Sequence, residues 1–480
     1  MKNKYLNNFL WRFAERWGAQ GVTFVVSLVL ARLLDPEVYG TVAIISVITA
    51  FLNVFIGAGF SGALIQKKNA DDLDFSTVFY FNCFLCLLLY IVLFFCAPLV
   101  AAFYSNPSLT PLVRVQGLAL IISGVKSVQV TYVSKNMQFR KFFFATLGGT
   151  VGAAAVGIIM ASLGYGPWAL IAQHLFNNLV DTIILTFTIK WKPKRVFSFS
   201  RLRSLFPVGI RLLASSLAYN VYVDLRQLLI GKVYSTEDLA MYNRGYSFPD
   251  FLGKNINSAL DSILFPAMAQ NQDDVGTIRG IVSRTMKTSV FVVSPMTTGL
   301  AVCAVPLIRL LLTDKWLPCV EYLRVFCVIY LLGHMHNTNQ NALKALGKVR
   351  TLLLFEVLKD IVELTVVIVT LQISVRAVAY GTVACQIVFA FACAAATSRY
   401  ISYTLPEQLR DLLPNILLTL FMGACVWSVT LLRLNDIPTL LVQIPLGIIV
   451  YLCGARMMKL DSFDYVLKNL TAYMPKRKAG

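Results

Sequence analysis

The sequence has little charge for its length. Only 14% of its 480 residues are Asp, Glu, Lys or Arg, whereas 57% are hydrophobic, and the mean hydropathy is +0.68. Soluble globular domains carry about 25% charged residues, so this composition excludes them. It predicts an all-α polytopic membrane protein.

Several motifs that carry chemistry are missing. Gly347 and Lys348 lack both the upstream glycine and the following Ser or Thr of a Walker A sequence, which argues against ATP-driven transport by this chain alone. No Ser-His-Asp or Cys-His arrangement stands out, and no loop is long enough for an external catalytic domain. We therefore expect no catalytic residues and predict that the chain is not an enzyme.

Metal binding is not expected either. The 10 cysteines follow no zinc or disulfide spacing, so we interpret them as small buried apolar residues. His334 and His336 lack a third ligand at a suitable place and are better explained as part of a polar cavity wall.

Apolar segments about 20 residues long, enough to cross a bilayer, recur along the chain. We expect about 14 transmembrane helices, over residues 8–33, 38–65, 76–103, 110–134, 142–163, 166–189, 205–232, 239–268, 283–312, 319–343, 351–373, 376–398, 411–432 and 437–457. The first segment contains charged residues and no cleavage site, which argues against a removable signal peptide.

The net charge of +19 is distributed in alternate loops. This distribution predicts that both termini are cytoplasmic. The excess of Lys and Arg then sets the orientation of the chain in the membrane and attracts anionic membrane lipids. No nucleic-acid partner is expected.

The chain contains an internal repeat. Residues 32–40 (RLLDPEVYG) correspond to residues 232–240 (KVYSTEDLA), and Arg114 corresponds to Arg324. Six predicted helices separate each pair, so the repeats have the same orientation in the membrane. Two six-helix lobes around a central cavity are typical of alternating access.

The predicted organisation has five parts. They are an N-terminal lobe (1–189), a basic cytoplasmic inter-lobe linker (190–204), a C-terminal lobe (205–398), two appended helices (399–458) and a basic cytoplasmic tail (459–480).

One predicted span, 239–268, is unusually polar. On a helical projection a stripe of side chains falls within about 40° of one line and extends roughly 27 Å. The stripe comprises Asn243, Ser247, Asp250, Lys254, Asn257 and Asp261. Polar groups at every membrane depth favour a cavity lining, whereas a helix held in a bundle by polar contacts is the structural alternative.

Other polar side chains lie on the spans 8–33 and 205–232. Arg12 and Arg16 either face the cavity or reach the membrane interface. The cations suit an anionic group such as a phosphate, and amide and aromatic side chains suit hydroxyl-rich ligands. The candidate substrate-binding residues are Arg12, Arg16, Arg211, Arg226, Asn243, Arg244, Tyr246, Lys254 and Asn257.

Buried acids in a membrane can also carry protons or Na⁺. The ion-coupling candidates are Glu15, Asp224, Asp250 and Asp261. A second charged group, Lys359, Asp360 and Glu363, has i,i+4 spacing and is interpreted as structural.

Five short segments resemble a known family. They are LLDPEVYG at 33–40, GAGF at 57–60, ALIQ at 63–66, DFSTVF at 74–79 and YGPWAL at 165–170. Together they resemble the polysaccharide-transporter branch of the multidrug/oligosaccharidyl-lipid/polysaccharide (MOP) superfamily, which includes the Wzx-type oligosaccharide flippases.

The resemblance implies a MATE-like fold and a flippase in the bacterial inner membrane. It implies that an undecaprenyl-diphosphate-linked oligosaccharide moves from the cytoplasmic to the outer leaflet for cell-surface polysaccharide such as capsule or lipopolysaccharide. Coupling to a H⁺ or Na⁺ gradient or to the membrane potential is expected, with no other cofactor. Polymerase and glycosyltransferase partners are possible. In relatives, basic residues on helices 1, 2 and 8 face the diphosphate, but residues 38–65 contain no basic residue.

Three other functions stay open. A cation-coupled exporter of small molecules would share the fold, although exporters of organic cations favour an acidic cavity. A membrane glycan polymerase or transferase would need a large catalytic loop. A non-transporting assembly partner would leave the polar stripe without a purpose.

Overall fold

The computed structural model describes residues 18, 20–57, 59–67, 69–136, 139–272 and 274–473. Within these ranges the chain is helical and contains no strand. Two compact units are formed, Met1–Ala240 and Met241–Gly480. The predicted lobes, 1–189 and 205–398, stay a prediction.

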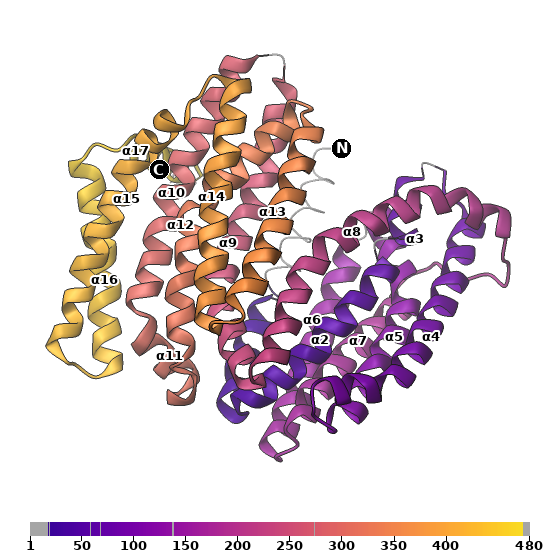
Figure 1. Cartoon of the computed structure of the whole chain (residues 1–480). Helices are drawn as coiled ribbons and strands as arrows, with labels where there is room; N and C mark the ends of the chain where they lie inside the picture. Colours follow the sequence, from indigo (N-terminus) through magenta and orange to yellow (C-terminus); the bar gives the residue numbers. More distant parts are fainter. Residues whose placement is uncertain are drawn as a thin grey trace, which may run out of the picture. The chain divides into compact units, whose positions relative to one another are not determined.

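The helices of unit 1 follow a first described helix, Gln20–Leu33. They are α2 (Pro36–Gly57), α3 (Phe60–Gln66), α4 (Asp72–Phe103), α5 (Leu109–Lys135), α6 (Phe139–Ser162), α7 (Pro167–Thr188) and α8 (Phe199–Val233) (Figure 1). The next helix, α9 (Thr236–Gln270), begins in unit 1 and continues into unit 2.

Unit 2 continues with α10 (Val275–Val302), α11 (Ala304–Leu312), α12 (Cys319–Ala345), α13 (Val349–Thr370), α14 (Val375–Ile401), α15 (Leu405–Ser428), α16 (Asp436–Met457) and α17 (Asp461–Tyr473). Short 3-10 turns lie at Asp314–Trp316 and Val429–Leu432.

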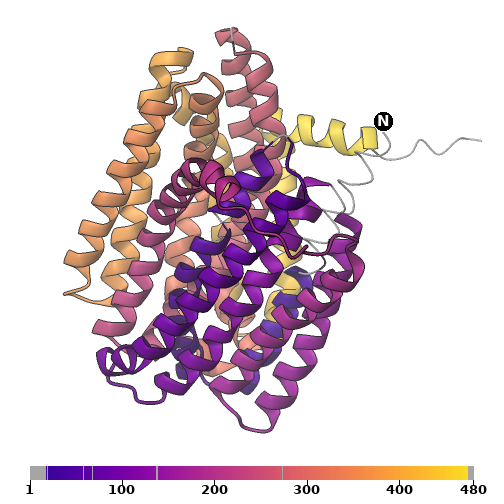
Figure 2. The ribbon, with the colours of Figure 1, turned by 90° about the vertical axis from the view of Figure 1, so that its right-hand side faces the viewer.

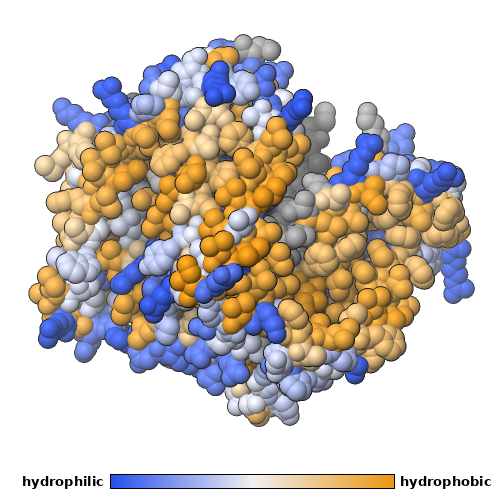
Figure 3. Space-filling model, viewed as in Figure 1, coloured by the Kyte–Doolittle hydropathy of each residue, from blue (hydrophilic) through white to orange (hydrophobic). Residues whose placement is uncertain are grey.

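Eight candidate spans among the described residues are long and apolar enough to cross a membrane. The number rises to nine if the bent pair α10–α11 counts as one span. α8, α9, α12 and α13 also have 22 residues or more, but charged side chains lower their hydropathy. Apolar side chains cover broad areas of the surface, and hydrophilic ones gather mainly toward the helix ends (Figure 3). The all-helical membrane fold is confirmed, whereas the count of 14 stays a prediction.

One of the predicted spans is interrupted. In span 283–312, α10 and α11 meet at an angle of 71° at Cys303. The break has a local cause, because Pro306 has no N–H to donate to the carbonyl of Val302 and its ring would clash there. The predicted span 38–65 corresponds to α2 and α3, which together form one candidate span, Pro36–Gln66.

One close helix crossing in unit 1 depends on a glycine. A Cβ at Gly40 of α2 would lie 1.7 Å from the carbonyl oxygen of Thr236, at the start of α9. These two residues belong to the two repeated segments, 32–40 and 232–240, which therefore pack against each other.

The repeat also appears in side-chain contacts. Arg114 of α5 donates to the carbonyl of Phe94 at 3.2 Å, and Arg324 of α12 donates to the carbonyl of Ala301 at 3.1 Å. Each guanidinium thus binds a carbonyl of the preceding long helix, α4 for Arg114 and α10 for Arg324.

α4–α5 and α6–α7 are the most closely packed helix pairs of unit 1, and α5 also contacts α2 and α7 (Figures 1 and 2). In unit 2, α10 packs against α12 and α15, and α14 packs against α12 and α13. Small residues at the crossings allow such packing in a membrane.

Candidate functional site

The described part of the polar stripe on α9 packs against α12. A Cβ at Gly245 would lie 2.5 Å from the Cβ of Tyr322, and one at Gly253 would lie 2.0 Å from the ring of Tyr330. These glycines bring α12 close enough for side chains of the two helices to interact.

Two of the predicted residues are held at this contact. The hydroxyl of Tyr330 donates to Oδ1 of Asp250 at 2.7 Å. The guanidinium of Arg244 lies 4.9 Å from the ring centroid of Trp316, which is fully buried. This is cation–π geometry. Asp250 and Arg244 therefore contact Tyr330 and Trp316 in this structure, and their roles in substrate binding and ion coupling stay predictions.

Replacing Tyr330 by phenylalanine is expected to lower the free energy of unfolding by about 1–3 kcal/mol, because the Asp250 carboxylate loses a charge-assisted hydrogen bond. Thermal unfolding of the detergent-solubilised chain would measure this. Tyr380→Phe, on an exposed side chain, is the control. Equal melting temperatures for the two variants would contradict the assigned bond.

The other predicted residues have different surroundings. Asn243 and Tyr246 are partly exposed on α9, and the Tyr246 ring lies 5.1 Å from that of Phe326. On α8, Arg226 is buried and Arg211 is exposed. Arg12, Glu15 and Arg16 lie outside the described residues, and so do the side chains of Asp224, Lys254, Asn257 and Asp261. Their roles stay predictions.

The charged group of α13 has neighbours on two helices. The ammonium of Lys359 lies 2.9 Å from Glu356 and 3.9 Å from Asp360. Oε1 of Glu363 accepts from Gln386 of α14 at 2.7 Å. His336 of α12 lies 3.7 Å from Glu356, and no group of three metal ligands occurs among the described residues.

Unit 1 contains an ion pair that sequence reasoning missed. The ammonium of Lys126 on α5 lies 2.8 Å from Oδ2 of Asp181 on α7, and Asp181 is buried. A Cβ at Gly149 of α6 would lie 2.2 Å from Oδ1 of Asp181. Each of the two charges lies inside an apolar span and away from its ends, and that placement is the signal that could have identified it.

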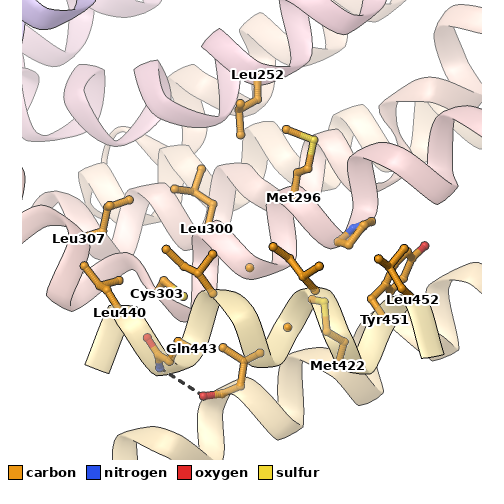
Figure 4. A pocket seen from close by; sticks show the side chains of 16 residues that line it. Leu252, Met296, Leu300, Cys303, Leu307, Met422, Leu440, Gln443, Tyr451 and Leu452 are labelled. Atoms are coloured by element: carbon orange, nitrogen blue, oxygen red, sulfur yellow. Dashed lines mark hydrogen bonds between the residues drawn. The ribbon is translucent and has the colours of Figure 1, made fainter. Parts of the chain in front are cut away.

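Unit 2 contains an apolar cavity of about 440 Å³. Its walls come from α10, α15 and α16, with Leu252 of α9 and Leu307 of α11 at its edge (Figure 4). The side chains of Met296, Ile444 and Ile448 line it and are at least 43% exposed, so the cavity opens to the surface. Its one amide, Gln443, donates to the carbonyl of Val426 at 3.2 Å.

The fold is that of a known class of membrane transporters. The structure matches the lipid II flippase MurJ in an inward closed conformation with a TM-score of 0.75 and 16% identity, over 94% of this chain and 98% of that one. It matches an inward-facing MATE family multidrug resistance transporter of the MOP superfamily with a TM-score of 0.64 and 14% identity, over 79% and 94% of the two chains. The chain therefore has the MOP-type fold.

Residues 29–321 match the family model described as polysaccharide biosynthesis protein. The chain belongs to that family.

Named relatives are similar over part of their length. The succinoglycan biosynthesis transport protein ExoT of Rhizobium meliloti is 25% identical over 64% of this chain and 63% of its own. The teichuronic acid biosynthesis protein TuaB of Bacillus subtilis is 26% identical over 62% of each chain. The lipopolysaccharide biosynthesis protein WzxC of Escherichia coli is 22% identical over 74% of each chain. The match thus spans less than two thirds of the first two relatives.

Proposed function

We propose that this chain is a flippase that moves an undecaprenyl-diphosphate-linked oligosaccharide from the cytoplasmic to the outer leaflet of a bacterial inner membrane, with both of its termini cytoplasmic. The observation that carries the proposal is membership of the polysaccharide biosynthesis protein family in a chain with a MOP-type transporter fold. Relatives named for succinoglycan, teichuronic acid and lipopolysaccharide support a glycan substrate over an organic cation.

The apolar cavity of unit 2 supports a lipid-linked substrate. An isoprenoid chain is a flexible hydrocarbon that packs against apolar side chains by van der Waals contact, and no polar group has to be desolvated when it does so. Leu300, Met422 and Leu440 provide such walls. The cavity, open to the surface, suits a lipid tail that stays in the membrane while its head group crosses.

Alternating access driven by an ion gradient or the membrane potential is part of the proposal. Collapsing the H⁺ gradient, the Na⁺ gradient and the potential together is expected to stop net accumulation of the glycan in the outer leaflet. Acids in transmembrane segments are the groups that carry such ions, and Asp250 is the described candidate among them.

The proposed diphosphate contacts are Arg244 and Lys254. Replacing either by alanine is expected to lower the rate of lipid-linked oligosaccharide translocation by about 10-fold or more, since a charge-assisted bond to phosphate is worth about 1.5–3 kcal/mol. The rate would be measured in vesicles containing the purified full chain. Arg244→Lys, which keeps the charge, is expected to retain more activity than Arg244→Ala.

Folded protein is checked for each variant by size-exclusion chromatography. Full transport by both alanine variants would overturn the diphosphate contacts. It would leave the flippase proposal in place.

A further inference from the structure

Unit 1 contains a polar pocket of about 340 Å³ between α2–α3, α5 and α7. Small-ligand pockets range from about 300 to 1,000 Å³. The volume of this pocket lies at the lower end of that range, which suits a ligand as small as one sugar ring. It is lined by serine, threonine and asparagine side chains and by Lys126.

The amides of the pocket leave acceptor oxygens available. Asn53 of α2 donates its Nδ2 to the carbonyl of Thr49 at 2.9 Å. Asn178 of α7 donates its Nδ2 to the carbonyl of His174 at 3.1 Å. Each amide nitrogen thus uses one of its two hydrogens within its own helix. The two Oδ1 atoms, which come from different helices, remain as acceptors for ligand hydroxyl groups.

Helix α5 contributes hydrogen-bond donors to the pocket. Ser123 and Ser134 of α5 line the pocket, and neither side chain hydrogen-bonds to another described group. Lys126 lies between them in sequence and uses one ammonium hydrogen toward Asp181 at 2.8 Å. An ammonium has three hydrogens, so Lys126 can donate to a ligand oxygen while its ion pair stays intact.

Hydrogen bonds between neighbouring helices hold the walls of the pocket in place. The fully buried Asn82 of α4 donates to Ser127 at 3.0 Å and to Ser61 at 3.4 Å, which joins α3 to α5. At Gly57 a Cβ would meet nothing within 4 Å, so that side of the pocket is open. A rigid pocket with donors and acceptors on separate walls suits a polyol, whose hydroxyl groups both donate and accept.

From these contacts we infer that the pocket between α2–α3, α5 and α7 binds a sugar residue of the transported glycan, with Asn53 and Asn178 as acceptors and Lys126 as a donor. The inference rests on the proposed function, because it assigns the ligand as part of that substrate.

The test uses full-length protein in lipid nanodiscs and saturation-transfer NMR. The probes are glucose, galactose, N-acetylglucosamine and glucuronate at millimolar concentrations, where weak sugar binding is detectable. Asn53→Leu and Asn178→Leu each remove one acceptor. Asn136→Leu is the matched control, because Asn136 also donates its Nδ2 to a carbonyl four residues back, that of Tyr132 at 2.9 Å, and lies outside the pocket lining.

We expect at least one sugar to give a saturable signal with the wild-type chain and with Asn136→Leu. Its affinity falls about fivefold in each pocket variant, the usual effect of losing one hydrogen bond. Absence of binding by all four sugars, or equal affinity in all variants, overturns the inference.

Translocation of lipid-linked glycan is measured on the same preparations. Sugar binding at the pocket without wild-type translocation would overturn the proposed function and support the pocket. Wild-type translocation with no sugar binding would support the proposed function and overturn the inference about the pocket.

Discussion

Replacing Gly40 by alanine is expected to prevent stable folding of the chain. The added Cβ would lie 1.7 Å from the carbonyl oxygen of Thr236 and 2.4 Å from its carbonyl carbon. Both are backbone atoms, so no side-chain rotation relieves the overlap, and the starts of α2 and α9 must separate. Strain of this kind in close-packed structure costs more than about 3 kcal/mol.

The measurement is the yield of monodisperse protein and its melting temperature after solubilisation. Gly333→Ala is the matched control, since a Cβ at this α12 position meets nothing within 4 Å and alanine stabilises a helix interior by about 1 kcal/mol relative to glycine. If Gly40→Ala melts at the same temperature as Gly333→Ala, the assigned crossing of α2 and α9 is wrong.

Replacing Lys126 by methionine is expected to destabilise unit 1 by about 3–5 kcal/mol. The substitution keeps the length of the side chain but leaves the buried carboxylate of Asp181 without its cation, and an unpaired buried charge has this cost. The ammonium of Lys126 donates a hydrogen bond to Oδ2 of that carboxylate at 2.8 Å. Thermal unfolding and protease resistance of the purified chain would measure the loss.

The double variant Lys126→Met with Asp181→Asn removes both charges. It is expected to recover most of the lost stability, because a neutral amide is far less costly to bury than a carboxylate. A double variant no more stable than Lys126→Met would show that the ion pair is not the cause of the loss.

The fold class could be predicted from the sequence because a bilayer imposes a single requirement on composition, a long apolar segment for each crossing. The family could be predicted because short segments such as 33–40 and 57–60 resemble it. Both predictions are confirmed by the family match and by the fold. The break at Cys303 had a visible signal in Pro306, although a continuous apolar segment concealed it.

The contacts within the site could not be predicted in the same way. Lys126 and Asp181 are separated by 55 residues, and Tyr330 and Asp250 by 80, so helical periodicity does not connect them. Charge clustered on one helix marks the stripe on α9, whereas Lys126 on α5 and Asp181 on α7 form no such cluster. For the same reason the sequence assigned most binding groups to the second half of the chain, whereas unit 1 contains a polar pocket of its own.

The central claim is that this chain moves lipid-linked oligosaccharide across a bilayer. Its most direct test uses sealed vesicles that contain the purified chain and a radiolabelled undecaprenyl-diphosphate-linked glycan, initially in one leaflet. The measured quantity is the fraction of glycan that a membrane-impermeant glycosidase releases from the opposite leaflet over time. We predict that this fraction rises in vesicles with the wild-type chain and stays at the level of protein-free vesicles with Gly40→Ala. A fraction equal to that of protein-free vesicles, with correctly folded wild-type chain present, would contradict it.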